Sequence, residues 1–92
     1  MVLTRTHAIT KEVQLFDGIL VYRMICSWSD EFDCEVYGAE CVAHFGKSTE
    51  TALVRDITAD KDRAELFFGM ITENVIFPSS LKDVAEDFAA MQ

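Results

Sequence analysis

The first half of the chain alternates between apolar and polar positions with the two-residue period of a β-strand. Two such runs, over residues 2–15 and 19–28, lie on either side of Asp17-Gly18. An Asp-Gly pair between apolar runs favours a tight hairpin turn, because both central residues of a type I′ turn need positive φ. We therefore expect a β-hairpin whose two-residue turn fixes the register and pairs Glu12 with Arg23.

A second hairpin is predicted directly downstream. Residues 35–45 and 48–57 alternate in the same way, and Gly46-Lys47 separates them. The acidic stretch 29–34 lies between the two hairpins and indicates a loop. The side chains that this hairpin is expected to place in the core are Tyr37, Ala39, Cys41, Ala43, Phe45, Ala52 and Val54.

The period changes after residue 57. Apolar side chains then recur three and four residues apart, a spacing typical of an amphipathic helix. Thr58 or Asp60 can cap the start of this helix, and Asn74 can end it. The apolar positions that define the helix are Ala64, Phe67, Phe68, Ile71 and Val75.

A second helix is predicted after Pro78, the only proline in the chain. Ser80 is its expected N-cap, because Asp83 follows three residues later in a variant of the capping box. The side chains expected to be buried are Leu81, Val84, Ala85 and Phe88.

Strands therefore come first and helices second, which predicts the α+β class. We expect one domain over residues 1–92, with a sheet region over 1–57 and a helical region over 58–92. The sheet is predicted to be antiparallel and four-stranded, built from the two hairpins, with both C-terminal helices on one face. The order of the strands does not follow from the pattern.

Short motifs in the second half of the chain add a resemblance. They are Tyr37-Gly38, residues 56–58 (Asp-Ile-Thr), the lone Pro78, and Leu81 followed by residues 83–88. Over residues 35–88 the chain resembles a family of short bacterial proteins known only as a domain of unknown function. Ala39 departs from the bulkier aliphatic residue expected after Tyr37-Gly38. The resemblance implies no activity, cofactor or catalytic residue, and it supports the same order of strands and helices.

The charge balance narrows the classes of partner. The chain has 16 acidic and 8 basic residues, and the basic residues are scattered along it. Since nucleic-acid affinity rests largely on clustered Lys and Arg, we expect no binding to nucleic acid or to an anionic membrane surface. The net charge of -8 would favour a cationic protein partner.

The compartment follows from three features. No apolar run approaches the ~20 residues that span a membrane. Residues 1–10 lack the continuous apolar segment of a signal peptide. The 3 cysteines are an odd number at uneven spacing, which favours reduced thiols over a disulfide framework. These features predict a cytoplasmic protein.

The most specific candidate for chemistry is the set Cys26, Cys34, Cys41 and His44, which is numerically complete for tetrahedral zinc. Its spacing, C-x7-C-x6-C-x2-H, contains no C-x2-C knuckle. Cys41 and His44 are also an odd number of residues apart, so a regular strand would point them to opposite faces. The alternative is that two of the cysteines are small buried side chains. The acidic stretch 30–35 could similarly be considered for calcium, but the central glycine of such loops is missing.

No convergent catalytic set appears in the sequence, and no metal or other cofactor is expected. We interpret the chain as a small non-catalytic interaction or regulatory module rather than an enzyme. A zinc-binding or thiol-reactive protein that uses Cys26, Cys34, Cys41 and His44 is the alternative. Elemental analysis separates the two hypotheses.

A homodimer is the last expectation. Half of the residues are hydrophobic, and the segment 19–28 is apolar on both of its faces. Two helices can cover only one face of a small sheet, so the other face would keep an apolar patch. The predicted interface residues are Ile19, Val21, Ile25, Val42 and Leu53.

Overall fold

The computed structural model describes residues 6–91 and has the predicted α+β architecture. Its strands are β1 (Thr6–Leu15), β2 (Gly18–Ser29), β3 (Cys34–Phe45) and β4 (Ser48–Thr58). The helices α1 (Lys61–Glu73) and α2 (Pro78–Ala90) follow. All neighbouring strands are antiparallel, and the order β1-β2-β3-β4 is a simple meander, which the sequence pattern had left open.

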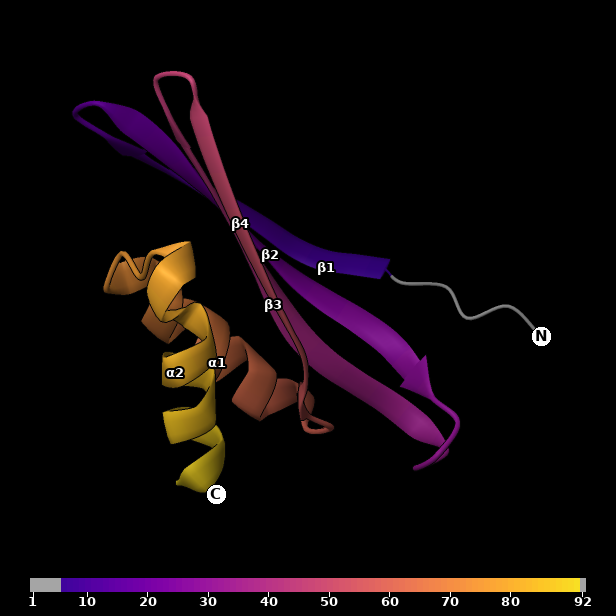
Figure 1. Ribbon diagram of the computed structural model, residues 1–92. Coiled ribbons are helices and arrows are strands. Elements are labelled where there is room, and N and C mark those ends of the chain that lie inside the picture. The colour runs from indigo at the N-terminus through magenta and orange to yellow at the C-terminus, as the bar shows by residue number, and fades with distance from the viewer. Residues whose placement is uncertain (1–5, 92) are drawn as a thin grey trace.

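Both helices lie on one side of the sheet (Figure 1). The core forms where they meet β2 and β3, and its innermost side chains include Leu20, Tyr22, Phe67 and Ile71. Within the helical layer, the rings of Phe67 and Phe88 lie 5.1 Å apart in a tilted arrangement. The guanidinium of Arg63 lies over the Phe88 ring, 4.7 Å from its centre. The predicted placement of the helices on one face is confirmed.

The register of the first hairpin differs from the prediction. Leu15 pairs with Gly18, so the turn residues are Phe16-Asp17 rather than Asp17-Gly18. A Cβ atom on Gly18 would overlap the Phe45 ring of β3, so the glycine is needed inside the strand for packing. Over residues 9–15 the pairing is shifted by two residues, which keeps each side chain on its original face, so the apolar pattern could not distinguish the two registers. The pairing changes again between His7 and Ile9, where the register is irregular.

This shift changes the partner of Arg23. In the structure Arg23 lies opposite Thr10 on one side and Glu40 on the other, and Glu12 lies opposite Val21. The predicted pairing of Glu12 with Arg23 is therefore wrong. Arg23 instead donates a hydrogen bond to Glu40, with 3.0 Å between Nη1 and Oε1.

The second hairpin follows the prediction, with Phe45 opposite Ser48 and Gly46-Lys47 in the turn. Gly46 has a φ of 59°, a conformation that favours glycine. Nearer the other end of β3, the register shifts between Tyr37 and Ala39. A Cβ atom on Gly38 would overlap the carbonyl oxygen of Val54, so glycine allows β4 to approach closely at this irregularity.

The helix boundaries confirm one predicted cap and correct another. Asp60 caps α1, because its Oδ1 accepts hydrogen bonds from the backbone N–H groups of Asp62 and Arg63 at 2.8 and 3.4 Å. The N-cap of the second helix is Phe77, three residues before the predicted cap Ser80. Pro78 takes the first position of α2, where its fixed φ fits and its missing N–H removes no helical hydrogen bond.

Candidate interaction surface

The face of the sheet that points away from the helices, here called the open face, is the main candidate site. Along β2, Leu20, Tyr22 and Met24 point to the helices, so the alternate residues point to the open face. Figure 1 shows no helix on this side of the described chain. The predicted interface residues Ile19, Val21, Val42 and Leu53 are half-buried there.

The sheet register arranges these side chains in rows across the strands. Val21 lies opposite Val42 and forms the apolar centre of the open face. One row away, Ile19 lies opposite His44, and on the other side Leu53 lies opposite Glu40. Ile25, the fifth predicted interface residue, is only 3 % exposed and is therefore part of the interior of its own chain.

An ion pair lies beside the apolar centre. The side chains of Arg23 and Glu40 are 32 % and 18 % exposed, and they occupy the row next to Val21 and Val42. The sequence pattern missed this pair, since it assigned Arg23 to Glu12. Only the order of the strands, which brings β3 next to β2, could have revealed it. The edge strands border the open face with polar side chains, namely Thr10, Glu12 and Gln14 of β1 and Thr49 and Thr51 of β4.

The four candidate zinc ligands do not converge. Cys26 and Cys41 lie on the helix-covered side of the sheet, opposite Tyr37 and Tyr22 respectively. Cys34 and His44 lie at the two ends of β3 and on the other side. Among residues 6–91, no group of three or more His, Cys, Asp or Glu side chains is arranged to hold a metal ion. The acidic loop 30–35 is included in that finding.

Two of the three thiols, those of Cys41 and Cys26, have raised pKa values and low reactivity. Burial, and to a smaller extent the negative charge of Glu40, raise the pKa of the Cys41 thiol to about 11. Burial also raises the pKa of Cys26 to about 11, and its hydrogen bond to Glu35 acts in the same direction. Because the thiolate is the reactive and metal-binding form, both groups are poor nucleophiles at neutral pH.

Cys41 has a structural neighbour in Tyr22. The Tyr22 hydroxyl donates a hydrogen bond to the carbonyl oxygen of Ile76 at 2.9 Å, and the Cys41 thiol donates to the same oxygen at 3.6 Å. Burial, followed by the charge of Cys41, raises the pKa of Tyr22 to about 12. These two side chains thus tie the connection between α1 and α2 to the centre of the sheet, which is a structural role.

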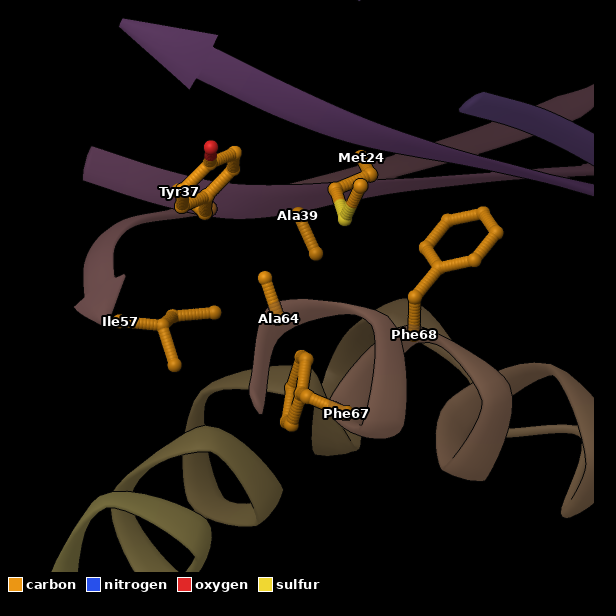
Figure 2. A pocket seen from close by; sticks show the side chains of 8 residues that line it. Met24, Tyr37, Ala39, Ile57, Ala64, Phe67 and Phe68 are labelled. Carbon is orange, nitrogen blue, oxygen red and sulfur yellow. The ribbon is translucent and has the colours of Figure 1, made fainter. Parts of the chain in front are cut away.

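The gap under the helices is part of the core. Figure 2 shows Met24 and Ala39 of the sheet pointing toward Ala64 of α1. The gap is too narrow to admit a sphere the size of a water molecule, and its lining is almost entirely apolar. It therefore offers no room for a substrate. The residues that line it are Met24, Tyr37, Gly38, Ala39, Ile57, Ala64, Phe67 and Phe68.

A larger hollow of about 440 Å³ lies at the end of the sheet opposite the β1–β2 and β3–β4 turns. It is lined by the β2–β3 turn and by the irregular end of β4. Its polar lining includes Asp30, Glu31, Arg55 and Asp56, and Trp28 contributes an aromatic wall. Asp56 has a φ of 56° and lies where β4 is irregular. No pattern in the sequence predicts this hollow. The lining contains no histidine, cysteine or lysine, and its hydroxyl and carboxylate groups come from Ser27, Ser29, Asp30, Glu31 and Asp56.

Three other apolar side chains are strongly exposed at separate places in the chain. Phe16 is fully exposed in the β1–β2 turn, Phe32 is 67 % exposed in the β2–β3 turn, and Leu66 is 63 % exposed on α1. Single exposed apolar residues are ordinary on protein surfaces. The open face is different because its apolar side chains adjoin one another across β2, β3 and β4.

Neither described helix has the length and apolar character needed to cross a membrane. The sequence model of a family of unknown function, DUF6514, matches residues 4–91. No curated protein and no solved structure matches the chain.

Proposed function

We propose that this chain, which belongs to the DUF6514 family of unknown function, is a small non-catalytic interaction module of the bacterial cytoplasm. The proposal rests on the geometry of the chain itself. Its contact surface is the open face of the sheet. The three thiols are unpaired, as is usual in a reducing compartment. A regulatory or adaptor role fits a chain that presents a surface rather than a reaction site.

One observation carries this proposal. The helices cover a single face of the sheet, yet β2 and β3 place apolar side chains on both. On the open face, Val21 and Val42 are only partly buried and lie next to Ile19. Burial of apolar surface is favourable by ~25 cal/mol per Å², so a contiguous patch of this kind supports association with a partner.

The zinc-binding and thiol-reactive alternative has no such support. Its four ligands divide between the two sides of the sheet, and the raised pKa values of Cys26 and Cys41 keep those thiols protonated. Elemental analysis of protein purified without a histidine tag tests this alternative. Zinc in stoichiometric amount that survives dialysis would count against the interaction module.

Site-specific photo-crosslinking in the native host tests the proposal directly. Thr51 and Glu50 are adjacent exposed residues of β4 whose side chains point to opposite sides of the sheet. A benzophenone amino acid at position 51 should give discrete crosslinked products, whereas the same probe at position 50 should give far fewer. Equal crosslinking at both positions, or none at position 51, would reject the open face as the contact surface.

A further inference from the structure

We propose that the open face binds the open face of a second copy of this chain, with a two-fold axis that runs parallel to the strands between β2 and β3. This inference rests on the proposed function and names its partner. In such a dimer, β2 of one copy lies over β3 of the other. The two sheets face each other with their strands aligned, as in a β-sandwich.

The rows of the open face are complementary to themselves under this operation. Val21 would lie over Val42 of the second copy, because the two residues are cross-strand neighbours and exchange places about the axis. Arg23 would lie over Glu40 of the second copy for the same reason. Within each chain, Arg23 and Glu40 form an ion pair of 3.0 Å. In the dimer this pair would face the same pair of the second copy in the opposite order, so the four side chains would form a ring of alternating charges.

The borders of the face are also compatible with this arrangement. The axis places β1 of one copy over β4 of the other, so Glu12 would lie over Thr51 and Leu53 over Thr10. No two side chains of like charge are stacked in these rows. The result is an apolar centre at Val21 and Val42, with the charged ring beside it and mostly polar side chains along β1 and β4.

The distribution of charge favours this face over the rest of the surface. The chain carries a net charge of -8, so two copies repel each other over most approaches. The exposed sides of the helices contribute to this repulsion through Asp62 and Glu65 on α1 and Glu86 and Asp87 on α2. In the three paired rows of the open face, the acidic residues are Glu12 and Glu40, and Arg23 offsets one of them.

The available area is sufficient for a stable pair. Four strands about 4.8 Å apart and about ten residues long form a surface of roughly 19 by 33 Å, or about 1,200 Å² for two copies. Specific interfaces need to exceed about 1,000 Å² in total. Pairing through the sheet edges is less favourable. The outer strand β1 carries Lys11 near its middle, and a charge there discourages addition of another strand.

Light scattering on the purified chain tests the dimer. We expect a mass of twice 10.4 kDa at micromolar concentration. Val21→Lys should weaken association by at least about tenfold, because each copy would bury an unpaired ammonium group. Glu50→Lys is the matched control, since it adds the same side chain on the opposite side of the sheet and should remain dimeric. Circular dichroism and thermal melting must show that both variants are folded.

A charge exchange tests the two-fold geometry. Arg23→Glu and Glu40→Arg should each be monomeric alone, because like charges would face each other across the axis. When the two variants are mixed, the two glutamates at positions 23 and 40 of one chain would face the two arginines at those positions of the other. A heterodimer should therefore form. A dimeric wild type whose two variants fail to combine would overturn the proposed axis.

The outcomes also separate this inference from the proposed function. A monomeric wild type would overturn the dimer. If that monomer still crosslinks through position 51 to a different protein, such as a cationic partner, the interaction module stands and only the second copy is rejected. If position 51 gives no crosslink at all, both proposals fail.

Discussion

The two faces of the same sheet illustrate two uses of apolar side chains. On the covered face, Leu20 and Tyr22 are completely buried and Met24 is 2 % exposed. On the open face, the neighbouring residues Ile19 and Val21 in the same strand are only partly buried. The covered face has large aromatic residues of α1 and α2 to bury it, whereas nothing in residues 6–91 lies over the centre of the open face. Stability therefore resides mainly on one face, and we infer recognition on the other.

Polar groups follow the same division. On the covered face, the Tyr22 hydroxyl and the Cys41 thiol are both satisfied by the carbonyl oxygen of Ile76 within the chain. On the open face, Arg23 and Glu40 satisfy each other but keep part of their surface in contact with solvent. The first arrangement fixes the helices on the sheet. The second leaves charged groups available to a partner.

The largest expected effect is the difference in stability lost when one side chain on each face is truncated. Phe67→Ala should lower the free energy of unfolding by about 3–5 kcal/mol, because the ring is 2 % exposed and contacts Phe88. Val42→Ala on the open face should lower it by about 1 kcal/mol or less in the monomer, since that side chain is only half-buried. Urea unfolding followed by circular dichroism measures both values. Equal losses would show that the two faces contribute alike.

A smaller effect is expected at Gly18, the glycine of the first hairpin that packs against Phe45. Gly18→Ala should destabilise the fold by about 1–3 kcal/mol, because the new methyl group would overlap the Phe45 ring. Gly69→Ala is the control, since no atom lies within 4 Å of its Cβ position. That variant should be neutral or stabilising, because alanine favours the helix. Thermal melts of the two variants give the comparison, and a stabilising Gly18→Ala would refute the packing role.

Loss of the hydroxyl on the covered face should have a modest effect. Tyr22→Phe removes the 2.9 Å hydrogen bond to Ile76 and should lower the free energy of unfolding by about 1 kcal/mol. The cysteine at position 41 still offers a donor to the same oxygen. The double variant Tyr22→Phe/Cys41→Ala should therefore lose more than the sum of the two single variants. Simple additivity would mean that the two donors act independently.

Stability is also expected to depend on alkaline pH. Burial raises the pKa of Cys41 from 9.0 to about 11, so the unfolded chain loses this proton first as pH rises. The contribution of Cys41 is fully present below pH 9 and is lost between pH 9 and about 11. Tyr22, raised from 10.0 to about 12, extends the loss upward. Urea midpoints at pH 8 and pH 10.5 should differ less in Cys41→Ala, and an unchanged difference would remove Cys41 as a cause.

The candidate surface was partly predictable. Alternation along the chain identified Val21 and Val42 as residues of one face, since the side-chain period of a strand is fixed by backbone geometry. It could not show that Ile25, which has the same parity as Val21, is buried at 3 % exposure. It also could not pair Arg23 with Glu40, because that contact depends on which strand lies beside β2.

Local chemistry in the sequence determined the type of each element, the faces of the strands, the turn at Gly46-Lys47 and the cap at Asp60. These features depend on residues close together in the chain. Tertiary packing decided the rest, including the register of the first hairpin, where Gly18 lies in β2 and packs against the Phe45 ring. Packing also decided which face the helices cover, because that choice depends on contacts between residues far apart in sequence, and periodicity carries no information about them.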